Sequence, residues 1–151
     1  MPTLKQLVEM ARFYKLNFLH LHLTDDQAFT FPSTRFPKVA AGSKYRYTLR
    51  ELAEVRAYAE LRAVTVIGEA DVPGHATAIT QADPDNFGFP SFPKTPIVNF
   101  VNATVIANLQ SIFDEIQAAL PSPYIAIGGD EVLTSLVHRE PLLHVDLRLC
   151  S

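Results

Sequence analysis

Tyr-Ile-Ala-Ile-Gly-Gly-Asp-Glu, residues 124–131, is the stretch around which the rest of the chain is interpreted. Its isoleucine-rich start is typical of a buried strand, and the two glycines that follow allow a tight turn or a close approach to a ligand. Adjacent residues leaving a strand point in different directions. We therefore expect Asp130 and Glu131 to address different parts of one ligand, as a charge stabiliser and an acid would. The alternative is a solvated acidic pair at a helix N-terminus.

Length and composition describe an ordinary globular domain. The chain has 151 residues, 48% of them hydrophobic, and a net charge of −3, which gives no support to nucleic acid as a partner. Cys150 is the one cysteine, so neither an internal disulfide nor a cysteine zinc site is available. No apolar stretch approaches the roughly 18 residues needed to span a bilayer, and we expect no membrane partner.

Helical and strand patterns alternate along the chain. Capping-box spacing at Thr3 and Thr48, together with apolar periodicity, predicts helices. Leu61 is among the positions expected to be buried. Continuous apolar runs predict strands, the first with both faces covered. The expected order is helix 4–15, strand 17–23, helix 49–62, strand 64–68, helix 103–120 and a strand at the start of 124–131, with a long connection over 24–47 and a proline-marked loop over 84–96.

Polar and acidic residues follow each predicted strand. Strands that alternate with helices favour a parallel sheet of the α/β class, in which ligands bind at the carboxyl ends of the strands. We therefore expect the acidic clusters after the three strands to share one rim. A closed barrel and an open doubly wound sheet both fit the pattern, and no glycine motif for nucleotide phosphates favours the open sheet.

Three motifs at these strand ends resemble glycoside hydrolase family 20, the β-N-acetylhexosaminidases. Residues 15–27, KLNFLHLHLTDDQ, resemble the second barrel strand of that family and its exit loop, with Leu21 where a tryptophan is usual. Residues 69–75, EADVPGH, are similar to the end of the third strand, and residues 127–132, IGGDEV, to the catalytic signature. The likeness covers about residues 4 to 133.

The resemblance implies roles for individual residues. Glu131 would be the general acid/base that protonates the glycosidic oxygen, and Asp130 would orient the 2-acetamido group of the substrate, whose own oxygen is the nucleophile. His75 and Asp25 would support the acid. Asp71 and Asp26 are the remaining candidates, for which capping of the turns they occupy is an equally good explanation.

The same resemblance implies the substrate, and it names no cofactor. The reaction expected is retaining hydrolysis of terminal β-linked N-acetylglucosamine or N-acetylgalactosamine from glycoconjugates or chito-oligosaccharides, without metal or organic cofactor. Family members are commonly lysosomal or extracellular, which is the localisation that the likeness suggests.

The resemblance also implies a truncated TIM (β/α)8 barrel with about three of its eight strands. We expect residues 1–133 to be a partial catalytic domain and residues 134–151 a divergent tail. The sugar-gripping arginine of the family's first strand would precede Met1, and the chain has no tryptophan to wall an acetamido pocket. A fragment of the enzyme is therefore the expectation.

Two other functions remain open. The chain could be an inactive remnant of the enzyme or bind amino sugars weakly. Alternatively, His20 and His22, alternate residues of one strand, could join His75 and Asp130 in the metal site of an amidohydrolase-like barrel. Asn102 starts a glycosylation sequon, but its place before a helix favours a capping role.

Overall fold

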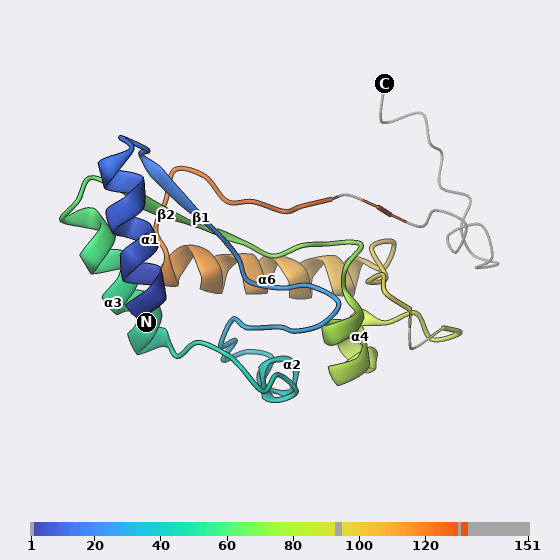
Figure 1. Ribbon diagram of the computed structural model, residues 1–151. Coiled ribbons are helices and arrows are strands. Elements are labelled where there is room, and N and C mark those ends of the chain that lie inside the picture. The colour runs from blue at the N-terminus through green and yellow to red at the C-terminus, as the bar shows by residue number, and fades with distance from the viewer. Residues whose placement is uncertain (1, 93–94, 130, 133–151) are drawn as a thin grey trace, which may run out of the picture.

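A computed structural model describes residues 2–92, 95–129 and 131–132. Asp130 and the tail from 133 onward lie outside the described residues. Helices pack beside a small sheet, and one or more helices precede or follow each strand (Figure 1). The elements are α1 (Pro2–Phe13), β1 (Phe18–His22), α2 (Pro37–Ala41), α3 (Leu49–Glu60), β2 (Thr65–Glu69), α4 (Thr77–Ala82), α5 (Pro84–Phe87) and α6 (Ala103–Ala119).

The sheet is parallel, as the alternating pattern predicted. Within the described residues it has two strands, β1 and β2, in a register that pairs Phe18 with Thr65 and His22 with Glu69. The segment 124–127 runs beside the other edge of β2. It forms one parallel bridge there, between Ala126 and Glu69, instead of the third strand that was expected.

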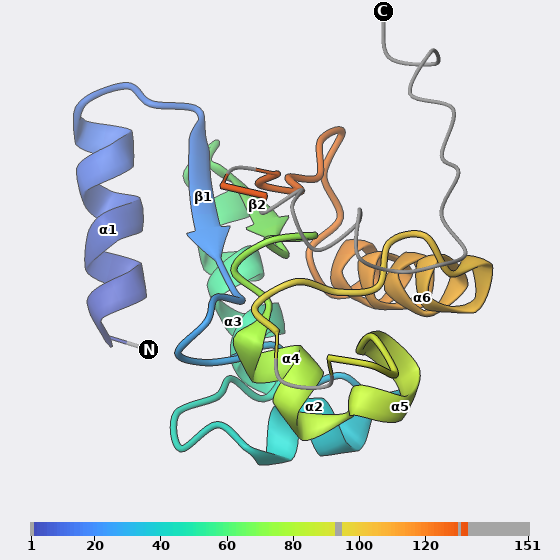
Figure 2. The same cartoon turned by 90° about the vertical axis from the view of Figure 1, so that its right-hand side faces the viewer.

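One face of the sheet is covered by helices, and the other is exposed in the described part of the chain. Leu21 of β1 and Val66 of β2 are buried in the core. Helix α6 runs along one face of the sheet (Figures 1 and 2). Phe18 lies on the opposite face and is 45% exposed, and Ile127 is 55% exposed. The expectations of a first strand covered on both faces and of a buried third strand were therefore wrong. A continuous apolar run does not reveal whether one side or both sides of a strand are covered.

Helix α6 packs closely against β2 because Gly68 has no side chain. A Cβ atom at Gly68 would lie 2.5 Å from Cγ2 of Ile116. The apolar face of α6 was predicted correctly and contributes to the core, and Asn102 caps the helix through Thr104 N, as expected. Its buried residues are Val105, Leu109, Ile112 and Ile116.

The capping-box prediction held for one helix and failed for another. Thr48 and Glu51 form a complete box at the start of α3. Helix α1 instead begins at Pro2, so Thr3 lies inside its first turn. The predicted buried position at Leu61 was wrong, because α3 ends at Glu60 and Leu61 is 85% exposed.

The long connections contain short helices that the sequence did not predict. Helix α2 lies within 24–47, α4 follows β2, and α5 begins at a proline. Among the described residues, no helix has the length and apolarity needed to cross a membrane.

Candidate active site

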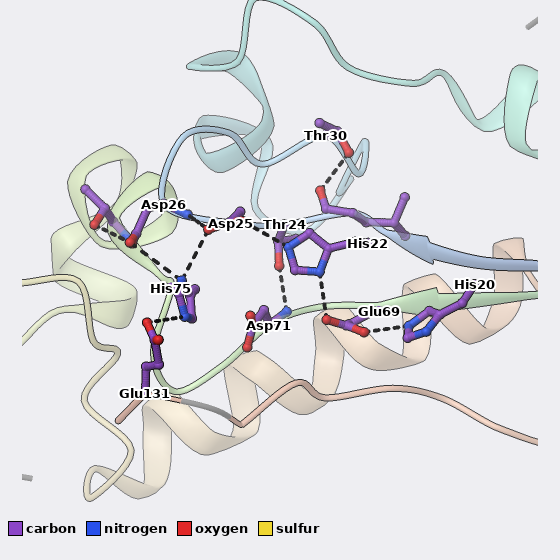
Figure 3. A network of polar contacts seen from close by, with 12 residues as sticks. His20, His22, Thr24, Asp25, Asp26, Thr30, Glu69, Asp71, His75 and Glu131 are labelled. Carbon is purple, nitrogen blue, oxygen red and sulfur yellow. Dashed lines mark hydrogen bonds and ion pairs between the residues drawn. The ribbon is translucent and has the colours of Figure 1, made fainter. Parts of the chain in front are cut away.

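The ends of β1 and β2 meet Gly129 and Glu131 at one side of the sheet, which gathers the described residues of the predicted acidic clusters. The parallel register brings His22 level with Glu69. Thr24, just beyond β1, accepts a 2.8 Å hydrogen bond from Asp71 N, just beyond β2. Figure 3 shows the resulting network of imidazoles and carboxylates. The common rim expected from the sequence is thus confirmed for the described residues.

His75 and Glu131 face each other at this rim. Nε2 of His75 lies 3.4 Å from Oε2 of Glu131, whose side chain is 78% exposed. Both residues have backbone in the left-handed region, with φ of 48° and 51°. Non-glycine residues adopt this conformation rarely and at a cost, and such strain is concentrated at functional sites. The pairing and the strain single out these residues as a candidate acid and its partner.

Asp25 contacts the other side of the His75 ring. Its Oδ1 lies 3.4 Å from Nδ1 of His75 and accepts a 2.6 Å hydrogen bond from Asp26 N. Burial acts to raise the pKa of Asp25, but hydrogen bonds from Asp26 N and from His22 outweigh it and hold the pKa below its usual value. Asp25 therefore remains a carboxylate next to His75, as the predicted supporting pair requires.

Asp26 has a structural role in this arrangement. Its Oδ1 accepts hydrogen bonds from Thr77 N at 3.0 Å and from the Thr77 hydroxyl at 2.6 Å, at the start of α4. Ala76 occupies the N-cap position and supplies no side-chain acceptor. Asp26 thus caps α4 from a distant loop, while its Oδ2 lies 3.8 Å from His75 Nδ1.

Asp71 holds the glycine turn that precedes Glu131. It is buried, and its Oδ1 accepts a 3.2 Å hydrogen bond from Gly129 N. A Cβ atom at Gly128 would lie 2.0 Å from that same oxygen, and Gly128 has φ of +67°. Position 128 therefore requires glycine for both space and conformation, which supports the close backbone approach expected from the two glycines.

Glu69 is a site residue that was not singled out from the sequence. One of its oxygens lies 2.7 Å from Nδ1 of His22, and the other lies 2.5 Å from Nε2 of His20. The sequence shows an acid at the end of one predicted strand and two alternate histidines in another, but the register that pairs them is seen only in the structure. The apolar context of these histidines favoured a core role, whereas both are about half exposed.

An open pocket of about 470 Å³ lies next to the candidate acid and is lined by Asp26, Gly74, His75, Pro96, Ile97, Glu131 and Val132. A separate cavity of about 10 Å³ lies deeper, between the loops after β1 and β2 and helix α6. The larger space has the size of a small-molecule site and contains the His75–Glu131 pair.

Of the predicted metal ligands, Asp130 lies outside the described residues, and the three histidines do not form one group. His20 and His22 contact Glu69, as two residues on one face should, but His75 lies between Asp25 and Glu131 (Figure 3). Two other trios have potential ligand atoms within 4.8 Å of one another, namely His22, Glu69 and Asp71, and Asp25, Asp26 and His75. Each trio has a histidine at ion-pair distance from a carboxylate, which accounts for the proximity without a metal.

Comparisons with known proteins agree with the motifs. The family model described as "Glycosyl hydrolase family 20, catalytic domain" matches residues 1–147. This match continues into the tail that the motifs did not cover, and the domain boundary at residue 133 stays a prediction. A beta-hexosaminidase of Akkermansia muciniphila is 34% identical over 92% of this chain and 33% of its own length.

Solved structures, including the following two, are also similar to this chain. A crystal structure of a beta-N-acetylhexosaminidase has a TM-score of 0.82 and 34% identity, covering 92% of this chain and 34% of its own. A family 20 exo beta-N-acetylglucosaminidase from Vibrio harveyi, in complex with N-acetylglucosamine, has a TM-score of 0.80 and 27% identity, covering 91% and 26%. The chain spans about a third or less of the length of these proteins.

Proposed function

The chain belongs to glycoside hydrolase family 20, and on this premise we propose that it carries the acid/base half of a β-N-acetylhexosaminidase site. The reaction is hydrolysis of terminal β-linked N-acetylglucosamine or N-acetylgalactosamine with retention of configuration. The substrate's acetamido oxygen is the nucleophile, which makes the reaction an exception to the two-carboxylate scheme.

Glu131 is the general acid. Its carboxyl group donates a proton to the glycosidic oxygen as the bond breaks, and the resulting carboxylate later takes a proton from water. Such a group typically contributes about 10² to 10⁴ in rate. Asp130, which lies outside the described residues, orients the acetamido group and stabilises the positive charge that develops on the oxazolinium ring.

The single observation that carries the proposal is the contact between Glu131 and His75, with Asp25 behind the ring. An acid that must lose and regain a proton needs a neighbour that responds to its charge. An imidazole held by a carboxylate does so, because it donates to Glu131 when Glu131 is ionised and accepts from it when it is protonated. The pair opens on the pocket of about 470 Å³, which leaves room for a sugar.

We place β1 and β2, each with the helices that follow it, and the segment 124–127 in a (β/α)8 barrel. The parallel register and the layer of helices on one face support this placement, because the uncovered face of β1 and β2 then becomes the barrel interior. His20 and His22 lie on that face. On this proposal, the remaining strands supply the walls of the sugar pocket.

A second candidate is a remnant that binds amino sugars without hydrolysing them. The exposure of Glu131 favours it, because an acid that is 78% exposed is not desolvated by the described residues. Catalytic acids usually act in sites from which water is excluded, and the described residues do not exclude it around Glu131.

A pair of chromogenic substrates tests the proposal. The chain should hydrolyse an aryl β-N-acetylglucosaminide and leave the matching aryl β-glucoside intact, because only the first carries the internal nucleophile. Equal rates on both substrates would refute substrate assistance. Saturable binding of N-acetylglucosamine without turnover of either substrate would favour the binding remnant.

A further inference from the structure

The His75–Asp25 pair is one end of a longer row of alternating carboxylates and imidazoles. In Figure 3 this row passes from the exposed acid across the ends of both strands. Successive members lie between 2.5 and 3.4 Å apart at their nearest polar atoms. In order they are Glu131, His75, Asp25, His22, Glu69 and His20.

Asp25 is shared between two imidazole rings, one on each of its oxygens. Oδ1 lies 3.4 Å from Nδ1 of His75, and Oδ2 lies 3.1 Å from Nε2 of His22. The other nitrogen of His22, Nδ1, lies 2.7 Å from Oε1 of Glu69. Ionised carboxylates only accept hydrogen bonds, so His22 satisfies both of them only by donating from both nitrogens, as an imidazolium.

The His22–Glu69 half of this row stands on regular structure. Both residues are in the parallel ladder and face each other in register. The Glu69 side chain is only 12% exposed, and its backbone oxygen accepts from Leu23 N at 3.0 Å. Asp25, His75 and Glu131, in contrast, lie on loops beyond the strand ends. The loop holds Oδ1 of Asp25 through the hydrogen bond from Asp26 N, and His22, backed by Glu69 on the strands, can hold its Oδ2.

We propose that His22 and Glu69 are positioning residues, which hold Asp25 as an anion and thereby fix the ring and the tautomer of His75 behind the acid Glu131. The inference rests on the function proposed above, because the His22–Glu69 pair acts through the Glu131–His75 contact. Asp25 then keeps the His75 proton on Nδ1, which leaves Nε2 to exchange a proton with Glu131.

The charges around His22 are consistent with this role. Glu69 of β2 and Asp25 of the following loop contact the ring directly, Asp71 lies nearby, and His20 shares Glu69. Burial acts to lower the pKa of His22, but its hydrogen bonds to Glu69 and Asp25 outweigh this and raise the pKa above its usual value.

Two matched variants of the full chain test the proposal by nitrogen-15 NMR of the imidazole rings. His20 and His22 lie on the same face of β1 and both contact Glu69, but only His22 reaches Asp25. In His22→Gln, the neutral His75 ring should shift from the Nδ1–H tautomer towards the Nε2–H tautomer that free imidazoles of histidine prefer. In His20→Gln, the His75 tautomer should stay as in the parent chain.

A third variant tests the charge of Glu69 without removing its shape. Glu69→Gln should lower the pKa of His22 by about one unit or more, because a neutral amide replaces the carboxylate at 2.7 Å. An unchanged His75 tautomer in a folded His22→Gln chain would overturn the proposal. So would a His22 pKa at or below about 6.5 in the parent chain, which is measured without any substitution.

The NMR measurements separate this inference from the function on which it rests. Absence of acetamide-dependent hydrolysis in the parent chain would refute the proposed function, whereas the tautomer of His75 is measured without turnover. With hydrolysis present, His22→Gln should lower kcat by about tenfold or more and leave KM nearly unchanged, because its effect reaches the acid and not the bound sugar. A change confined to KM would contradict the positioning role.

Discussion

His75 Nε2 lies 3.4 Å from Oε2 of Glu131, although the two residues come from loops that follow different segments of the sheet. Both residues have left-handed backbone. The predictions for Glu131 and Gly128 depend on this contact and on the glycine turn held by Asp71.

Glu131→Gln should reduce hydrolysis of N-acetylglucosaminides by about 10² to 10⁴, because an amide cannot donate the proton that the leaving oxygen needs. The loss should be smaller for substrates whose leaving group is already a stable anion. Steady-state rates across aryl leaving groups of different acidity check this dependence. Glu60→Gln, at the far end of α3, is the control and should retain full activity.

Asp130→Asn should mainly slow cyclisation of the acetamido group, because a neutral side chain stabilises the developing oxazolinium charge less well. Its rate loss should therefore be much less sensitive to the acidity of the leaving group than that of Glu131→Gln. Comparison of the two variants on the same substrate series checks the assignment. Full activity in either variant would contradict it.

Gly128→Ala should destabilise the chain by about 1 to 3 kcal/mol, because a left-handed alanine is strained and its Cβ would overlap the Asp71 carboxylate. The turn must then move and carry Glu131 with it, so hydrolysis should also fall. Gly42→Ala is the matched control, with ordinary helical backbone and nothing within 4 Å of an added Cβ. Urea unfolding and hydrolysis rates of both variants give the comparison.

Asp26→Ala should cost about 0.5 to 2 kcal/mol of stability, because Thr77 N at the start of α4 loses its acceptor. Thr77→Val removes only the hydroxyl contact and should cost less. Chemical denaturation measures both. Loss of activity without loss of stability in Asp26→Ala would show that Asp26 acts on His75 and not as a cap.

Glu115 should make stability depend on pH in the acid range. Burial acts to raise the pKa of Glu115, but hydrogen bonds from Ser33, Thr34 and Arg35 lower it overall. A carboxylate whose folded pKa is depressed stabilises the fold above its unfolded pKa, and this contribution is lost as pH falls through the folded pKa. Glu115→Gln should therefore cost on the order of 1 kcal/mol at pH 7 and little at acid pH. Equal costs at both pH values, measured by urea unfolding, would contradict this.

Treatment with a chelator such as EDTA should leave hydrolysis unchanged, because the proposed chemistry uses two carboxyl groups and the substrate's own amide. Activity that is lost on chelation and restored by a divalent cation would support the alternative of a metal site like that of an amidohydrolase barrel. The same treatment followed by urea unfolding separates a structural metal from a catalytic one.

The sequence predicted the order of the helices and strands better than it predicted which of their faces are buried. Alternating apolar runs and capping signals predicted α3, α6, the two strands and a parallel sheet, because these patterns are local. Exposure of the strands depends on what packs against them, which no local pattern encodes. For this reason the face of β1 that carries Phe18 and the segment around Ile127 were wrongly expected to be buried.

The candidate site was predicted only in part, because some of its contacts follow from the order of the elements and others from the register between strands. Asp25, His75 and Glu131 follow strand ends, and parallel topology alone brings such residues to one rim. Glu69 was missed because its partners are set by the register between two strands, and a shift of one residue would turn it to the opposite face. Its position beside His22 became visible only with that register.

The left-handed backbone at His75 and Glu131 also bears on how this protein could be made more robust. Glycine adopts that conformation without strain, so a survey for stabilising substitutions would place these two positions near the top. Both choices would delete the side chains that face each other in the pocket. On the proposed function, a glycine at either position would raise thermal stability and abolish or reduce hydrolysis. Stabilising substitutions therefore belong elsewhere in the fold.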